Sequence, residues 1–200
     1  MSLSTMTADL VLLGAPGSGK GTQAAILTEK YGIPHIATGD IFRAQAAQHT
    51  ALGRQVKTFL DRGELVPDAL AIDVIRDRLS HADVEAGFVL DGFPRTVLQA
   101  QALDRLLSGL RRPLDAVLYL EVARPELLER LGQRATVEQR SDDDPRVAAH
   151  RIDVYLQSTA PLIDYYRQRG KLQVIDGGQP PGAVAEQIER VIGGLKTGAV

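Results

Sequence analysis

The sequence predicts an α/β protein in which five parallel strands form one sheet flanked by helices. Five short apolar segments recur along the 200-residue chain, and segments with helical spacing separate them. Strands that alternate with helices form parallel βαβ units with right-handed crossovers. In addition, a glycine-rich turn lies between the first apolar segment and the first helical one. That arrangement is typical of α/β proteins that bind phosphate groups.

The strands are expected where apolar runs of about five residues lie between glycines, prolines or charged residues. Runs of this length and composition are typical of strands buried on both faces of a parallel sheet. The expected strands cover residues 9–13, 33–37, 87–91, 116–120 and 172–176.

Helices are expected where apolar residues recur every three or four positions. The expected helices cover residues 23–31, 69–79, 96–110, 125–131, 147–168 and 183–195, with two short helices across 40–62 that break near Thr50 and Gly53. The polar segment 132–146 is expected to be a loop or small lid. The predicted core domain therefore comprises 8–37, 68–131 and 147–200, with inserted lobes at 38–67 and 132–146.

Composition narrows the possible functions. The formal net charge of -2 argues against nucleic acid as a partner. The chain has no cysteine, so disulfides and thiolate zinc sites are excluded, and its four histidines have no metal-like spacing. No run approaches the ~20 apolar residues of a membrane helix. We expect a cytoplasmic monomer that binds neither membrane nor zinc.

The glycine-rich turn fits the G-x-x-x-x-G-K pattern of a phosphate-binding loop. Its backbone N–H groups and the following helix N-terminus would hold phosphate oxygens, while Lys20 reaches the β- and γ-phosphates. The alternative, a plain turn with a surface lysine, is disfavoured because strand, loop and helix occur in the required order. The predicted ATP-phosphate residues are Gly14, Ala15, Pro16, Gly17, Ser18, Gly19, Lys20, Gly21 and Thr22.

The residues after Lys20 narrow the class further. Most P-loop NTPases carry a Ser or Thr directly after the lysine to bind Mg²⁺. Here Gly21 stands at that position and the hydroxyl of Thr22 comes one place later. This disfavours a GTPase or motor ATPase and matches the nucleoside monophosphate kinases.

Four blocks of sequence together resemble the adenylate kinase family from about residue 8 to 195. These are GAPGSGKGTQ at 14–23, TGDIFR at 38–43, DGFPRT at 91–96, and a sparse arginine series from 130 to 151. The resemblance implies a P-loop NTPase-type three-layer fold with a helical AMP-binding lobe and a short lid. It also implies reversible transfer of a phosphoryl group from Mg-ATP to AMP, which gives two ADP.

The resemblance further assigns roles to individual residues. Asp91 would hold Mg²⁺ through water, and Arg130 and Gln179 would lie at the ATP adenine. The residues that would surround the transferring phosphates are Lys20, Arg95, Arg134, Arg140 and Arg151. The residues that would bind AMP are Thr38, Gly39, Arg43, Leu65, Val66, Gly92, Phe93, Arg95, Gln99, Arg140 and Arg151.

Three alternatives stay open at this point. A UMP or CMP kinase would share the fold and the phosphate loop, and Thr38, Thr96 and Gln99 favour adenine over those bases. A P-loop kinase with a small non-nucleotide acceptor would lack the paired TGDIFR and DGFPRT blocks. A nucleotide-binding regulator without turnover would have lost the arginines. The lid departs from the family pattern in having Gln133 and Gln139 where glycine is usual.

Overall fold

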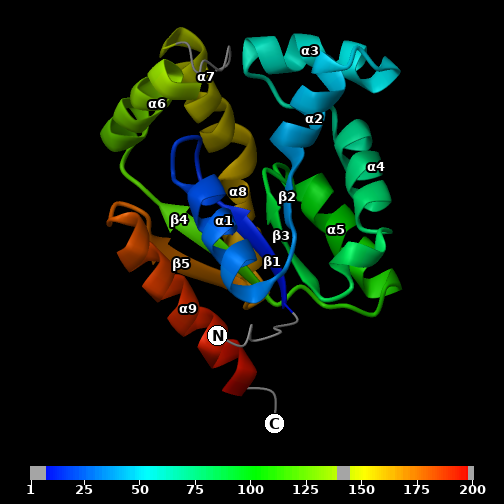
Figure 1. Ribbon diagram of the computed structural model, residues 1–200, viewed down its shortest axis with the longest axis vertical. Coiled ribbons are helices and arrows are strands. Elements are labelled where there is room, and N and C mark those ends of the chain that lie inside the picture. The colour runs from blue at the N-terminus through cyan, green and yellow to red at the C-terminus, as the bar shows by residue number, and fades with distance from the viewer. Residues whose placement is uncertain (1–7, 139–144, 198–200) are drawn as a thin grey trace.

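The structure is a computed structural model that describes residues 8–138 and 145–197. Its centre is a five-stranded parallel sheet in the order β2-β3-β1-β4-β5 (Figure 1). The strands are β1 (Ala8–Leu13), β2 (His35–Ala37), β3 (Gly87–Asp91), β4 (Ala116–Glu121) and β5 (Leu172–Asp176). The predicted α/β fold with five parallel strands is confirmed.

Helices cover both faces of the sheet because its central strands are apolar on both faces. Leu10 and Leu12 of β1 pack with α1 (Lys20–Tyr31) and α9 (Pro181–Thr197). Val11 and Leu13 point the other way, toward α4 (Asp68–Arg78), α5 (Val97–Gly109) and α8 (Pro161–Gln168). Successive residues of a strand face opposite sides, so one continuous apolar run fills two cores.

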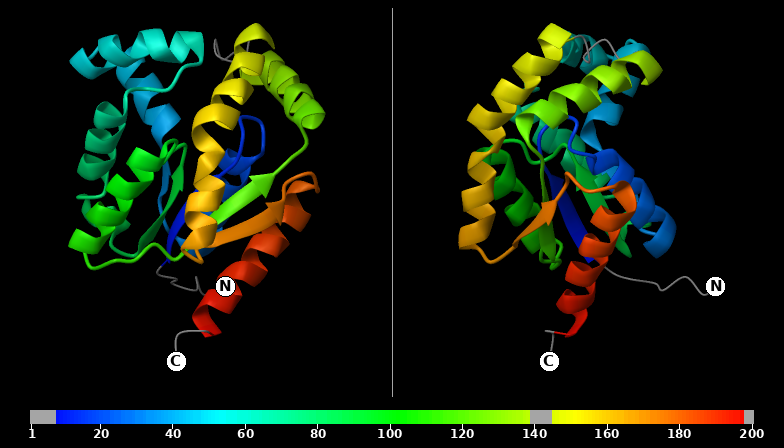
Figure 2. Two further views of the ribbon diagram at one scale, coloured as in Figure 1. Left: turned by 180° about the vertical axis from the view of Figure 1, so that it is seen from behind. Right: turned by 90° about the vertical axis from the view of Figure 1, so that its left-hand side faces the viewer.

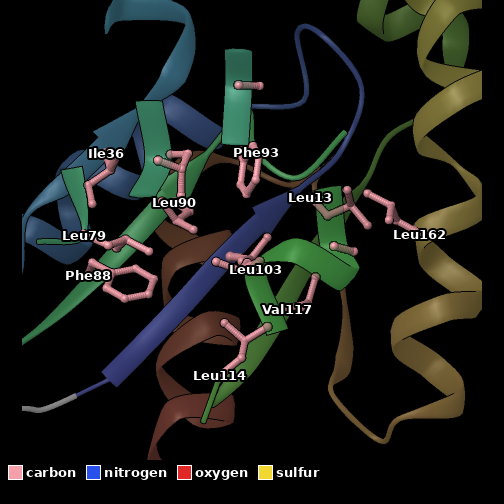
Figure 3. Packing of buried hydrophobic residues seen from close by; sticks show 14 of the residues in the cluster. Leu13, Ile36, Leu79, Phe88, Leu90, Phe93, Leu103, Leu114, Val117 and Leu162 are labelled. Carbon is pink, nitrogen blue, oxygen red and sulfur yellow. The ribbon is translucent and has the colours of Figure 1, made fainter. Parts of the chain in front are cut away.

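The larger of the two cores combines aliphatic side chains with most of the chain's aromatic rings. Figure 3 shows Phe88, Leu90 and Phe93 gathered beside β1, with Leu103 of α5 in the same cluster. A third, smaller cluster lies beside the phosphate loop. Its buried members are Ala15, Leu127, Leu131, Ala148, Ile152 and Tyr155.

Two helical pairs stand at the same end of the molecule, one on each side (Figures 1 and 2). One pair is α2 (Thr38–Ala47) and α3 (Ala51–Arg62), and the other is α6 (Arg124–Glu138) and α7 (Pro145–Val154). Both pairs follow the carboxyl ends of strands. In open parallel sheets, ligands bind outside this edge.

Three details of the predicted helices are wrong. Gly53 lies inside α3 and does not break it; an added Cβ would lie 1.9 Å from the Gln45 carbonyl oxygen, so glycine permits close packing of α3 on α2. The single helix expected over 147–168 is interrupted by a π-helical turn, η3 (Tyr155–Thr159), just before Pro161. Proline lacks the N–H that a continuous helix needs there.

The third correction concerns the segment expected to be a lid loop. Helix α6 continues through residue 138, so the first seven residues of 132–146 are helical. Residues 145 and 146 begin α7, and residues 139–144 lie outside the described part of the chain. Residues 132–138 include a glycine and few apolar side chains, so the sequence did not indicate that the helix continues through them.

Candidate active site

The phosphate loop joins β1 to α1 and is packed from below by α6. Gly17 has a φ of 85°, and a Cβ there would lie 3.0 Å from the Leu127 carbonyl oxygen and 3.1 Å from Leu131 Cγ. Only glycine allows both that conformation and that approach. Ala15 is buried in the small cluster formed with α6 and α7. The loop is therefore shaped by packing with α6 as well as by its own glycines.

Lys20 lies in the first turn of α1 and bonds back to the loop. Its Nζ donates to the carbonyl oxygens of Gly14 at 2.9 Å and Ala15 at 3.0 Å, and lies 3.4 Å from the Ser18 hydroxyl. Burial lowers the pKa of Lys20 to about 8, and the nearby positive charges of three arginines add to this, whereas Asp91 opposes it. An ammonium group in these surroundings gains strongly from an anionic ligand.

Asp91 ends β3 inside the same cleft, where His35 faces it. His35 Nε2 lies 3.6 Å from Asp91 Oδ2, and both side chains are largely buried. Burial alone would raise the pKa of Asp91, but the His35 imidazole and the charges of Lys20 and Arg95 outweigh it, so this pKa lies below its usual range. Beyond its place in the second expected strand, no feature of the sequence indicates His35 as part of the site.

A cleft of about 840 Å³ brings most of the predicted ATP residues together. Its walls include the phosphate loop, Asp91, and the arginines of three different elements. The predicted residues that line it are Gly14, Pro16, Gly17, Ser18, Gly19, Lys20, Gly21, Thr22, Gly39, Arg43, Leu65, Asp91, Gly92, Arg95, Arg130, Arg134, Arg151 and Gln179. Cationic side chains from separate elements converging beside a phosphate loop suit a polyanionic ligand.

The loop after β5 also lines this cleft, and short hydrogen bonds shape it. Gln179 Nε2 donates to Asp176 Oδ2 at 2.9 Å, and the Gly178 N–H donates to Asp176 Oδ1 at 3.0 Å. Arg130 forms an ion pair with Glu126 one turn earlier in α6. Gly178, Gln179 and Arg130 all line the cleft.

A second cavity of about 50 Å³ lies between α2, the 63–66 segment and the start of α5. The predicted AMP residues that line it are Thr38, Gly39, Arg43, Leu65, Val66, Gly92, Arg95, Gln99 and Arg151. Thr38 donates to the Asp91 carbonyl oxygen at 3.2 Å, and Arg43 forms an ion pair with Asp40. Arg43, Arg95 and Arg151 line both cavities.

Arg95 is held at several points. Its Nε donates to the Gly92 carbonyl oxygen at 2.8 Å, and its main-chain N–H donates to Gln99 Oε1 at 2.7 Å. Its own carbonyl accepts from the Thr159 hydroxyl at 3.0 Å. These contacts fix the backbone that carries this guanidinium between the two cavities.

Three predicted residues are not among those that line the cavities. Phe93 is 1 % exposed and packs in the large core, where a side chain that size fills the space between β3 and α5. Ala15 belongs to the small cluster under the loop. Arg140 lies outside the described residues. Within residues 8–138 and 145–197, no three acidic or histidine side chains are grouped to hold a metal ion.

Two adjoining cavities that share arginines, one of them containing a phosphate loop, define a P-loop phosphotransferase that brings two anionic ligands together. The family model for Adenylate kinase matches residues 12–171. The chain is 50% identical over 189 residues to an adenylate kinase of Cyanothece sp., covering 94% of this chain and 97% of that protein. It is 51% identical over 182 residues to one of Xanthomonas campestris pv. campestris, covering 91% and 96%.

A third relative, the adenylate kinase of Thermobifida fusca, is 46% identical over 190 residues, which is 95% of this chain and 99% of that protein. The chain belongs to the adenylate kinase family, and its activity is reversible phosphoryl transfer between ATP and AMP. The alternatives of a UMP or CMP kinase and of an inactive regulator are not favoured. No helix in the described part of the chain is long and apolar enough to span a membrane.

Proposed function

We propose that the larger cleft takes Mg-ATP, that the smaller cavity takes the base of AMP, and that the AMP phosphate enters the cleft beside Arg43 and Arg95, where the γ-phosphoryl group is transferred in line. The observation that carries this assignment is that Arg95 and Arg151 line both cavities, beside Lys20 and the phosphate loop. A phosphoryl group in transfer spreads negative charge over its oxygens, so cations at the junction stabilise it. No side-chain nucleophile is needed, because an AMP phosphate oxygen attacks.

We propose individual roles from the residues that line the two cavities. Lys20 exchanges its bonds to the Gly14 and Ala15 carbonyls for bonds to ATP phosphate oxygens. Arg43 and Arg95 hold the AMP phosphate, while Thr38 and Gln99 hold its base beside Val66 and Leu65. We assign Arg130 and Gln179 to the ATP base and Arg134 and Arg151 to the transferring group. Arg140, which lies outside the described residues, is given the same role from the family resemblance alone.

Magnesium enters as part of the Mg-ATP substrate. A Mg²⁺ ion bound with a nucleotide takes one or two carboxylates, substrate oxygens and water, so a dedicated cage is not required. Asp91 fits this requirement, because it is a carboxylate within the phosphate cleft whose pKa lies below its usual range. When bound, the ion would neutralise charge on the phosphates.

Two lobes are proposed to close over the substrates, at 38–67 over AMP and at 132–146 over ATP. The small cluster that α6 and α7 form with Ala15 shares one partly buried residue, Tyr119, with the larger core, which supports movement of this pair with little exposure of the two main cores. Closure excludes water, which would otherwise accept the phosphoryl group. Because both cavities lie within one chain, we propose a monomer; a cytoplasmic location, where both nucleotides occur, is also proposed.

The test is a coupled assay of ADP formation with Mg-ATP and either AMP, UMP, CMP or GMP as acceptor. Turnover with AMP far above the others is expected. Lys20→Met and Arg95→Ala are expected to lower kcat/KM by about a thousandfold or more while circular dichroism stays unchanged. A near-normal rate in either variant would overturn the assigned role of that residue.

A further inference from the structure

Asp68 begins α4 and forms a hydrogen-bonded bridge to the start of α5. Its Oδ1 accepts from Gln99 Nε2 at 2.7 Å, and its Oδ2 accepts from the Thr96 hydroxyl at 3.0 Å. Gln99 is 2 % exposed and lines the small cavity, whereas Asp68 lies behind it and lines neither cavity. Asp68 can therefore influence a ligand in the small cavity only through the side chain of Gln99.

The Gln99 amide has only one orientation that satisfies its neighbours. A carboxylate accepts hydrogen bonds, so the NH₂ group of the amide must face Asp68. A main-chain N–H donates, so Oε1 must face Arg95, where the N···O distance is 2.7 Å. Rotating the amide by half a turn would place two acceptors together at Asp68 and two donors together at Arg95. Each of these mismatches leaves a buried polar group unpaired.

This fixed orientation has a direct consequence for the base that the cavity accepts. Each amide atom keeps one further hydrogen-bonding position, a donor on Nε2 and an acceptor on Oε1. Adenine offers its exocyclic amine as a donor next to a ring nitrogen that accepts, and a glutamine amide pairs with both. A purine with an oxo group in place of the amine offers an acceptor there and would meet Oε1.

We propose that Asp68 is a positioning residue that sets the preference for adenine over 6-oxopurines by holding the Gln99 amide in one orientation. The inference rests on the proposed role of Gln99 in binding the AMP base. If the acceptor at residue 68 is removed, only the Arg95 N–H still opposes rotation of the amide, and a rotated amide offers its NH₂ group to an oxo group.

The test compares AMP with inosine monophosphate (IMP), which differs from AMP at this exocyclic group and has an oxo group there. The kcat/KM of each is measured as acceptor at saturating Mg-ATP; where IMP turns over too slowly, its inhibition constant against AMP replaces it. The proteins are wild type, Asp68→Ala, Gln99→Ala and the double variant. Asp73→Ala is the matched control, since Asp73 is a carboxylate of the same helix that is exposed and pairs with Arg76.

Asp68→Ala is expected to reduce the AMP-to-IMP ratio about tenfold, the size of one charge-assisted hydrogen bond, with the KM for ATP unchanged. In the Gln99→Ala background, the same substitution is expected to leave the ratio unchanged, because Asp68 acts through the amide. Asp73→Ala should match wild type. Should Asp68→Ala fold poorly, Asp68→Ser keeps a residue suited to a helix start but ends one bond short of the amide, and the same loss is expected.

Two results would overturn the inference. One is an equal change for AMP and IMP in Asp68→Ala, which would mean that Asp68 only joins α4 to α5. The other is a change of ratio that persists when Gln99 is alanine. If Gln99→Ala itself leaves both the AMP KM and the ratio unaltered, the proposed base-binding role of Gln99 fails instead.

Discussion

The hydroxyl of Thr159 donates a 3.0 Å hydrogen bond to the main-chain carbonyl of Arg95, 64 residues earlier in the chain. Thr159 is 4 % exposed and ends the π-helical turn that joins α7 to α8. Through this contact, the irregular turn braces the arginine assigned to the junction of the two cavities. Extra-residue helical turns are frequent at functional sites, where they re-aim side chains.

Thr159→Val keeps the shape of the side chain but removes the donor. We expect the KM for AMP to rise about fivefold, because the Arg95 carbonyl loses a buried partner and its backbone loosens. The KM for ATP should change much less. Steady-state kinetics with each substrate varied in turn measures this, with Thr159→Ser, which retains the hydroxyl, as control. Equal shifts in both KM values would argue against a specific brace on Arg95.

The pKa of Lys20 makes the affinity of the protein for ATP dependent on pH. Burial first, and neighbouring arginines second, lower that pKa to about 8, so the ammonium loses its proton as the pH rises through this value. ATP binding should therefore weaken about tenfold between pH 7 and pH 9. Calorimetric titration of ATP without AMP measures it. In Lys20→Arg the guanidinium stays protonated, so its affinity should be nearly constant, and a flat wild-type profile would refute the prediction.

Gly63 ends α3 and lies against Arg151 of α7. Its φ is 69°, and an added Cβ would lie 2.7 Å from Arg151 Cγ and 3.0 Å from Val147 Cγ1. Gly63→Ala should lower kcat about tenfold, because the arginine at the junction must shift. It should also cost about 1 kcal/mol of stability through backbone strain.

Gly32→Ala is the matched control for Gly63→Ala. Gly32 ends α1 with a φ of 71°, yet a Cβ there would meet nothing within 4 Å. Both substitutions should lower the free energy of unfolding by similar amounts, whereas only Gly63→Ala should slow catalysis. Urea unfolding and turnover rates on the same preparations separate the two effects. Similar losses of turnover in both would assign the effect to strain alone.

The pair of Asp9 and Arg112 is expected to stabilise the fold at the edge of the sheet opposite the site. Asp9 is 4 % exposed, and Arg112 donates to both of its carboxylate oxygens and, at 2.7 Å, to the Val84 carbonyl. Arg112→Met should cost about 3 kcal/mol, because it leaves a buried charge unpaired. Lys57→Met, which breaks an exposed pair with Asp61, should cost about 0.5 kcal/mol or less. Chemical denaturation compares them, and similar costs would count against the burial argument.

Much of the fold could be predicted because local signals and global structure agree in the strands. Apolar runs of five or six residues with glycine or charge at their ends left little choice. The helices were harder, since Gly53 suggested a break although the close packing of α2 on α3 requires a glycine inside α3. The π-turn lies just before Pro161, and the contact of its last residue, Thr159, with Arg95 joins positions 64 residues apart.

The sequence likewise predicts some residues of the candidate site and not others. The phosphate loop could be predicted because its motif is contiguous, whereas the irregularly spaced arginines were predicted from the resemblance to the adenylate kinase family. His35 and Asp68 could not, because each gains its significance from a side chain on another element, Asp91 and Gln99 respectively. A single sequence contains no signal for such pairs. Phe93 shows the converse, since it lies within a binding motif but packs into the core.

Arg151 lines both cavities, and the aliphatic part of its side chain lies against Gly63 at the end of α3. One cation is thus common to two anionic ligands. Any coupling that this residue transmits between the cavities must be reciprocal, so occupancy of either cavity changes the affinity of the other by the same factor. Arg151 can therefore contact both ligands at once only when both carry a phosphate group. Water has no phosphate and cannot take the place of AMP in this contact.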